Sequence, residues 1–268
     1  MGELVFIGLG LHDELGISLR GLDAVKQSDF IFAEFYTSLM SGFSKERFER
    51  EAGKEIRVLS RKDLEDEEGE LILLRAAEGS AVLLVPGDPL IATTHVDLRI
   101  RAEIRGLKTR IIHAASIISA VIGLSGLQNY RFGRSVTIPF PHGRHVSETP
   151  YEVISENKTR NLHTLCFLDI EVEEGRFMTI NDSLRVLSTL EERKQKGMIT
   201  QESMAVGIAR AGSEDPLVKA DHVKSLLSFD YGNCPHSLII PAEHLHFMEA
   251  EALITLASAP DDVRRMVR

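Results

Sequence analysis

Short apolar runs alternate with amphipathic stretches throughout the first half of the chain, and this alternation limits the folds open to it. The runs are rich in β-branched residues and end at glycines or polar residues, which is typical of buried strands. Strands are expected at residues 4–7, 30–33, 55–59, 81–85 and 109–113. Helices are expected after Ser18, a predicted N-cap, and near residues 64–77 and 95–105. Continuous apolar strands that alternate with helices predict a parallel sheet covered by helices on both faces.

The pattern changes over residues 130–150, a segment that contains two glycines and three prolines. Such a composition is typical of a linker or a crossing between domains. Beyond it, strands are expected at 162–168, 204–209 and 237–240, and helices at 183–196 and 246–257. The chain is therefore predicted to form two α/β domains, over residues 1–130 and 131–268.

The composition narrows the class of protein further. The 268 residues carry a formal net charge of −9, with 43% hydrophobic and 26% charged residues, which predicts a globular protein without a nucleic-acid partner. The two cysteines, Cys166 and Cys234, are too few for a disulfide framework and favour a reducing, cytoplasmic compartment. Cys166 is expected to be a small buried apolar residue. No signal peptide is evident, and the apolar stretch at 111–127 is too short and too polar to span a membrane.

Three turns follow strands of the predicted first sheet, at the edge where open α/β folds bind ligands. The first is Gly8-Leu9-Gly10-Leu11, whose glycines let the backbone approach a ligand or simply make a tight turn. The second, at 86–89, holds Asp88 between two prolines. Two interpretations stay open: Asp88 contacts a ligand, or its carboxylate only accepts a hydrogen bond from the backbone of its own turn. The third, at 113–120, opens a helix near Ser116 with small residues and free backbone N–H groups.

Two segments of the second half also carry residues suited to a site. Arg210-Ala211-Gly212-Ser213 follows a predicted strand, and Cys234-Pro235-His236 precedes another. His244 and His246 lie near His236, but their spacing matches no zinc signature, so no metal site is predicted. The sequence also contains no nucleophile elbow, no phosphate-binding lysine loop and no catalytic-triad spacing. Methyl transfer from a sulfonium depends mainly on positioning and needs no such groups.

The order of these turns is similar to that of the tetrapyrrole-methylase superfamily of S-adenosylmethionine-dependent enzymes. Within it, the chain most resembles the diphthine-forming branch of archaea. The segments that carry this closer match are Ala33-Glu34-Phe35-Tyr36-Thr37-Ser38-Leu39, Pro86-Gly87-Asp88-Pro89-Leu90-Ile91-Ala92-Thr93-Thr94-His95, Phe167-Leu168-Asp169-Ile170, Ala209-Arg210-Ala211-Gly212-Ser213 and Pro235-His236. The resemblance implies a homodimer of two-domain chains, with S-adenosyl-L-methionine in the cleft between the domains. It implies cofactor contacts from Leu11, Asp88, Ile91, Ser116, Ile117, Leu168, Ala211 and His236.

The reaction that the resemblance implies is methylation of the amino group on a modified histidine of translation elongation factor 2, which gives diphthine in diphthamide biosynthesis. One alternative is a relative that methylates a tetrapyrrole, such as a precorrin or uroporphyrinogen. The carboxylates of that substrate would favour convergent basic residues. The candidates for such residues, expected instead on a solvated helix face, are Arg99, Arg101, Arg105 and Arg110.

The other alternative, from a different class, is a nicotinamide-dependent oxidoreductase. Asp13 stands where the dinucleotide fingerprint needs a glycine, which counts against this class. The expected lack of an acidic residue at the end of the second strand counts against it too.

Overall fold

The computed structural model describes residues 2–143 and 145–268. Its backbone divides into two compact units. Unit 1 is the chain up to Ile117 together with Val172–Glu174, and unit 2 comprises Ile118–Glu171 and Gly175–Arg268. The division falls ahead of residue 130, where the composition places the boundary. Within the described residues, no helix has the length and apolar character needed to cross a membrane.

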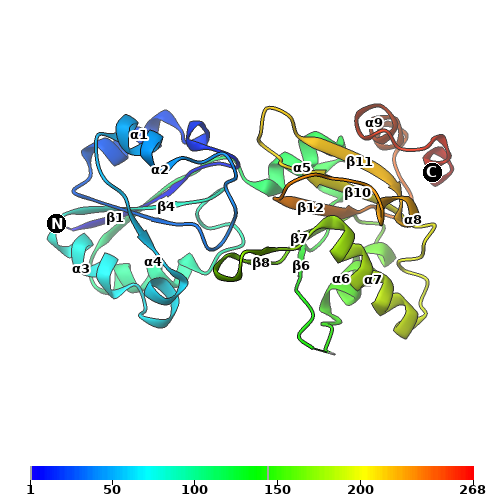
Figure 1. Ribbon diagram of the computed structural model, residues 1–268, viewed down its shortest axis with the longest axis horizontal. Coiled ribbons are helices and arrows are strands. Elements are labelled where there is room, and N and C mark those ends of the chain that lie inside the picture. Colours follow the sequence, from blue (N-terminus) through cyan, green and yellow to red (C-terminus); the bar gives the residue numbers. More distant parts are fainter. Residues whose placement is uncertain (1, 144) are drawn as a thin grey trace. The chain divides into compact units, whose positions relative to one another are not determined.

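Unit 1 is built on a five-stranded parallel sheet in the order β3-β2-β4-β1-β5. Its strands are β1 (Glu3–Gly8), β2 (Phe30–Glu34), β3 (Arg57–Leu59), β4 (Ser80–Val85) and β5 (Lys108–Ile112). Its helices are α1 (Leu19–Gln27), α2 (Lys45–Ala52), α3 (Glu70–Glu78) and α4 (His95–Ile104), with the short helical turns η1 (Glu14–Gly16) and η2 (Lys62–Asp66). Figure 1 shows α1 and α2 on one face of the sheet and α3 and α4 on the other. The predicted parallel sheet with both faces covered is confirmed.

Alternate residues of the central strands enter two separate cores, one on each face of the sheet. Phe6 of β1 packs in a core with Ile72 of α3 and Leu98 of α4. Its neighbour Val5 packs in the other core, with Phe48 of α2. A strand buried on both faces must be apolar at every position, and this continuous run is the pattern that predicts β1 from the sequence.

Unit 2 contains a mixed five-stranded sheet in the order β11-β10-β12-β7-β6, in which β6 and β7 run parallel and the other neighbours run antiparallel. Its strands are β6 (Val136–Ile138), β7 (Thr164–Leu168), β10 (Met204–Ala209), β11 (Leu217–His222) and β12 (His236–Ile240), and a separate ribbon pairs β8 (Ile170–Glu171) with β9 (Arg176–Phe177). The helices are α5 (Ile117–Ser125), α6 (Thr149–Thr159), α7 (Ile180–Lys194), α8 (Val223–Leu226) and α9 (Phe247–Ala257), with the turns η3 (Asn129–Arg131) and η5 (Asp261–Met266). The turn η4 (Val172–Glu174) belongs to unit 1. Figure 1 shows α6 and α7 on one face of this sheet and α5 and α9 on the other.

Two predictions about these elements are wrong. The helix expected near residues 64–77 is two pieces, η2 and α3, because Glu68 and Gly69 adopt positive φ values of 56° and 66° between them. The segment 130–150 is not a linker, since it contains β6, whose Ile138 is fully buried opposite Leu168 of β7. A three-residue strand beside prolines is too short to show a periodic pattern. The pattern also does not predict α2, α6 or β11.

A buried carboxylate joins several segments of unit 2. Glu249 of α9 is fully buried, and its Oε1 accepts hydrogen bonds from His163 Nε2 at 2.9 Å and from the Gln128 backbone N–H at 3.0 Å. Its Oε2 accepts from the His246 backbone N–H at 2.9 Å and from the Arg131 guanidinium. Burial alone would raise the pKa of Glu249, but these hydrogen bonds, foremost that of His163, lower the pKa to about 2. The carboxylate is therefore ionised in the folded protein at neutral pH.

We predict that Glu249→Gln destabilises the fold in a pH-dependent way. The pKa of Glu249 in the folded state, about 2, lies below the ordinary glutamate value of about 4.3. The charge therefore stabilises the fold above the ordinary value, and this stabilisation is lost as the pH falls through the folded-state value. Near neutral pH the variant should lose about 3 kcal/mol of unfolding free energy, and the difference from the wild type should close as the pH falls from about 5 to about 2.

Urea unfolding over this pH range measures the effect. Glu251→Gln is the control, since Glu251 lies on the same helix but is exposed and pairs with Arg264 at the surface. The control should unfold like the wild type at every pH. A constant difference between Glu249→Gln and the wild type down to about pH 2 would contradict the proposed ionisation.

Candidate functional site

The turns that follow β1 and β4 lie against each other at the carboxyl edge of the first sheet. The Gly10 N–H donates to the Gly87 carbonyl at 3.2 Å, and the Gly87 N–H donates to the Gly10 carbonyl at 2.6 Å. Both glycines have positive φ, 79° and 69°, which residues with a Cβ rarely adopt. A Cβ on Gly8 would lie 2.5 Å from the Gly87 carbonyl oxygen. Glycine at these positions thus favours the packing of the two turns, whatever ligand the turns hold.

Asp88 connects the second turn to the third. Its Oδ2 lies 2.7 Å from His113 Nδ1 and accepts a longer bond, 3.4 Å, from the Ala114 backbone N–H just after β5. Asp88 is only 7% exposed, whereas the His113 side chain is 72% exposed. The Asp88 carboxylate therefore bridges two turns instead of bonding only its own. The sequence does not predict His113 as this partner, although His113 ends a predicted strand.

The other expected cofactor residues of unit 1 lie on the same turns. Leu11 ends the first turn, Ile91 follows the second, and Ser116 and Ile117 stand where α5 begins. Ile91 is 40% exposed, and the other three are partly buried. Because β4, β1 and β5 are neighbours in a parallel sheet, these residues share one sheet edge with Asp88.

The three expected cofactor residues of unit 2 share an edge of the second sheet. Leu168 ends β7, Ala211 lies two residues after β10, and His236 begins β12. β12 runs antiparallel to both neighbours, so its first residues lie beside the last residues of β7 and β10. All three side chains are buried. Leu168 also packs in the main core of the unit, as expected from its apolar run.

The imidazole of His236 carries an unpaired polar atom. Its Nδ1 accepts a weak hydrogen bond from the Ile180 backbone N–H at 3.4 Å, and its buried Nε2 has no hydrogen-bond partner in the described part of the chain. The carbonyls of Gly232 and Asn233 approach the ring without forming a bond of ordinary geometry. Burial lowers the pKa of His236, so the ring is neutral and, with Nδ1 as acceptor, its hydrogen sits on Nε2. A buried N–H without an acceptor is unfavourable, and a bound ligand or water would satisfy it.

A buried cluster at the end of β2 was not predicted. The strand ends in Glu34, so the expectation that no acidic residue stands there is wrong. Glu34 is fully buried and accepts hydrogen bonds from the backbone N–H groups of Tyr36 at 3.0 Å and Thr37 at 3.1 Å. Its Oε1 also lies 3.1 Å from His95 Nε2. The carboxylate is thus engaged by the chain itself and is not available to a nucleotide ribose, which still argues against the oxidoreductase.

Asp13 and Cys166 have local structural roles. Asp13 is the N-cap of η1, where its carboxylate accepts a hydrogen bond from the Leu15 backbone N–H at 3.0 Å. This role explains an aspartate where a dinucleotide fingerprint needs glycine. Cys166 is fully buried in β7, and burial raises the pKa of its thiol to about 12, which confirms its prediction as a small apolar residue. Among residues 2–143 and 145–268, no group of three or more His, Cys, Asp or Glu side chains could hold a metal ion.

Comparisons with known proteins decide the family. A family model described as Tetrapyrrole (Corrin/Porphyrin) Methylases matches residues 3–226. The chain belongs to this family. The predicted superfamily is thereby confirmed, and as a methylase the protein requires a methyl donor.

Individual relatives align with nearly the whole chain. The chain is 49% identical over 265 residues to the diphthine synthase of Methanosarcina acetivorans, an alignment that covers 97% of this chain and 98% of that protein. It is 47% identical to the diphthine synthase of Methanothermobacter thermautotrophicus, with 98% of this chain and 99% of that protein covered. A crystal structure of diphthine synthase matches with a TM-score of 0.90 at 43% identity, covering 99% of this chain and all of that one. The predicted resemblance to the diphthine-forming branch is confirmed.

Proposed function

We propose that this protein transfers a methyl group from S-adenosyl-L-methionine to the amino group of the modified histidine of translation elongation factor 2, the reaction that forms diphthine. The observation that carries this proposal is 49% sequence identity to a diphthine synthase over 97% of this chain and 98% of that protein. The cytoplasm is the proposed compartment, because both cysteines are free thiols.

The proposed cofactor contacts are Leu11, Asp88, Ile91, Ser116, Ile117, Leu168, Ala211 and His236. When bound, S-adenosylmethionine supplies a methyl group on a positively charged sulfur. Two features of the chain fit such a ligand. The buried Asp88 carboxylate offers a hydrogen-bond acceptor at the carboxyl edge of a parallel sheet, and the buried Nε2–H of His236 is a donor that lacks a partner among the described residues.

The acceptor amine must be neutral to attack, and a site shielded from water disfavours the ammonium form of an amine. The chain then needs to hold the acceptor and the methyl donor in line more than it needs a strong base. Positioning of this kind can lower a barrier by about 7–11 kcal/mol. Turns built from glycines and backbone amides suit such positioning.

The arginines argue against a tetrapyrrole substrate. Arg101, Arg105 and Arg110 form ion pairs with carboxylates of unit 1, and Arg99 Nε donates to the Thr109 hydroxyl at 3.0 Å. They therefore do not converge as a free basic site for a polycarboxylate. Arg110 lies on β5, so its predicted place on a helix face is wrong.

We predict that S-adenosylhomocysteine binds and that NAD does not. Isothermal titration calorimetry with the two ligands side by side measures this, and a comparable heat for NAD would contradict it.

Asp88→Ala should weaken S-adenosylhomocysteine binding by about 1–3 kcal/mol, since it removes an acceptor for the ligand. Asp97→Ala, which removes an exposed carboxylate paired with Arg101, should bind normally. A folded Asp88→Ala protein with unchanged affinity would leave Asp88 as a link between turns only.

We predict methyl transfer to elongation factor 2 that carries the unmethylated 3-amino-3-carboxypropyl histidine. The factor is incubated with the enzyme and S-adenosylmethionine, and the histidine-containing peptide is mapped by mass spectrometry. A gain of methyl mass on that peptide is expected. No gain there, together with turnover of a tetrapyrrole, would reassign the enzyme to its relatives.

We also propose a homodimer, by resemblance to the family. Val96, Ile100 and Ile104 follow each other at one-turn spacing on α4 and are 52%, 52% and 79% exposed. A stripe of exposed apolar side chains is typical of a surface that a partner covers. Sedimentation at micromolar concentration should give twice the chain mass of 29.8 kDa, and a monomer at that concentration would overturn the proposal.

A further inference from the structure

The Tyr36 hydroxyl is a buried polar group that the proposed cofactor contacts do not explain. Tyr36 is 7% exposed, and its hydroxyl has no hydrogen-bond partner within the described residues. The Thr94 side chain approaches this hydroxyl without forming a bond of ordinary geometry. Burial, and then the charge of Glu34, raises the pKa of Tyr36, so the hydroxyl stays protonated. Buried hydroxyls are nearly always bonded, because an unpaired one lowers stability.

Two segments far apart in the sequence hold Tyr36 in place. Glu34 accepts a hydrogen bond from the Tyr36 backbone N–H, and the ring of His95 meets the Tyr36 ring edge-on, with centroids 6.3 Å apart. His95 in turn contacts Glu34 at 3.1 Å in a fully buried pair. Glu34 therefore holds the backbone of Tyr36 and His95 contacts its ring, while the hydroxyl has no partner among the described residues.

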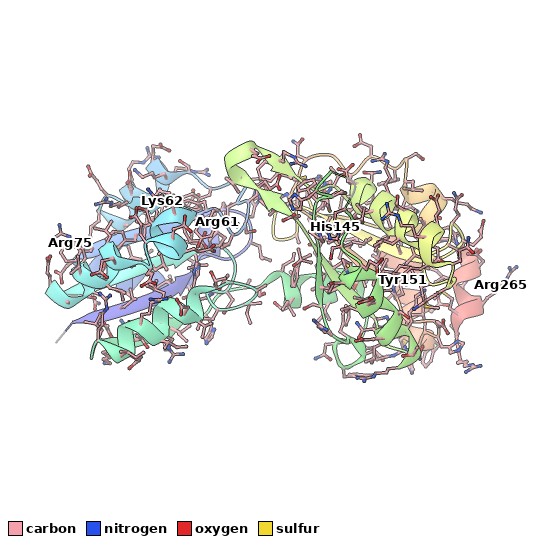
Figure 2. The ribbon with its side chains drawn as sticks, turned by 90° about the horizontal axis from the view of Figure 1, so that it is seen from below. Arg61, Lys62, Arg75, His145, Tyr151 and Arg265 are labelled. Atoms are coloured by element: carbon pink, nitrogen blue, oxygen red, sulfur yellow. The ribbon has the colours of Figure 1, made fainter. Side chains whose placement is uncertain are left out.

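Arg61 lies over the face of the Tyr36 ring, with its guanidinium carbon 5.3 Å from the ring centroid. The side chain is exposed, and within the described residues it forms no ion pair, whereas its neighbour Lys62 pairs with Glu67 at 3.3 Å. Figure 2 shows Arg61 beside Lys62, and Arg75 apart from both within unit 1. An unpaired guanidinium on an aromatic ring is suited to bind a carboxylate through two parallel hydrogen bonds.

This cluster lies next to the cofactor turns. β2 and β4 are neighbours, with Ala33 opposite Leu84, so the end of β2 lies beside the turn at 86–89. Leu90, adjacent to the proposed cofactor residue Ile91, packs against the same core as Tyr36. A group bound at Tyr36 would thus be near a methyl donor held by those turns.

We propose that Arg61 and Tyr36 form the recognition site for the acceptor, in which Arg61 binds the carboxylate of the 3-amino-3-carboxypropyl group and the Tyr36 hydroxyl accepts a hydrogen bond from its amine. This inference rests on the proposed function. The carboxylate and the amine of the acceptor are attached to the same carbon, which suits two binding groups as close as a guanidinium stacked on a phenol. The proposal requires the exposed Arg61 side chain to turn toward the incoming carboxylate, so that the amine can reach the buried Tyr36 hydroxyl.

The test compares variants in methyl transfer to elongation factor 2 that carries the unmethylated group. Arg61→Gln should raise the KM for the elongation factor about 10- to 100-fold, the effect of losing a charge-assisted hydrogen bond. Arg61→Lys should recover part of this loss, because it restores the charge without the planar fork. Both should bind S-adenosylhomocysteine like the wild type. Tyr36→Phe should lower kcat/KM for the elongation factor while its melting temperature stays the same or rises.

Two matched controls accompany these variants. The guanidinium carbon of Arg75, on α3, also lies 5.3 Å from a ring centroid, that of Phe30. Phe30 begins β2, so this pair lies at the opposite edge of the sheet. Lys62 is the charged neighbour of Arg61. Arg75→Gln and Lys62→Gln should both leave the KM for the elongation factor unchanged.

The outcomes separate this inference from the proposed function. A wild-type enzyme that binds S-adenosylhomocysteine but does not methylate the elongation factor would overturn both. An active wild type with an unchanged KM in Arg61→Gln, or an unchanged kcat/KM in Tyr36→Phe, would overturn the acceptor site alone. Equal weakening of S-adenosylhomocysteine binding in Arg61→Gln would also overturn it, because Arg61 would then act on the cofactor.

Discussion

The close approach of Gly10 and Gly87 is the constraint on which the first candidate site depends. β1 and β4 run parallel along their whole paired length, yet the turns that leave them meet through a pair of reciprocal backbone hydrogen bonds. Glycine favours this approach, since Gly10 and Gly87 have positive φ values and a Cβ on Gly8 or Gly10 would lie within 3 Å of backbone atoms. The consequence is a rigid edge at which Asp88 is held against the turn that follows β5. A carboxylate fixed by His113 has its orientation set before any ligand arrives.

Unit 2 reaches a comparable arrangement by a different route. Its sheet is largely antiparallel, so a strand start and two strand ends meet at one edge, and the residues gathered there come from β7, β10 and β12. No glycine-rich pattern marks this edge as strongly as in unit 1. His236 shows its role only through its surroundings, a buried neutral ring whose Nε2 is unpaired within the described residues.

The sequence predicts the parallel sheet of unit 1 because each central strand is apolar on both faces, and such runs stand out without any tertiary information. It also predicts the turns, since glycine, proline and aspartate at strand ends have few alternative explanations. It fails where the decisive fact is a contact between distant segments. Glu34 is an ordinary acidic residue until His95, far along the chain, is found beside it. The short β6 is recognised only because β7 pairs with it. Leu11, Ile91 and Leu168 carry no chemical signal, so the family resemblance alone selects them.

Buried polar groups without a hydrogen-bond partner add candidates to Asp88, which is buried and hydrogen-bonded. Glu249 and Glu34 are both fully buried, and both accept several hydrogen bonds, so their carboxylates are explained by the fold. His236 Nε2 and the Tyr36 hydroxyl are buried within equally ordered surroundings, but the described part of the chain provides neither with a partner. A fold that meets the needs of two buried carboxylates could meet those of a ring nitrogen and a phenol as well. That these two are left unpaired, one at the edge of each sheet, is best explained by ligands that complete them. The buried hydroxyl of Tyr231 also lacks a partner among the described residues. The missing bond therefore gains its meaning from position, since His236 begins β12 and Tyr36 follows β2, both at edges where the proposed cofactor contacts lie.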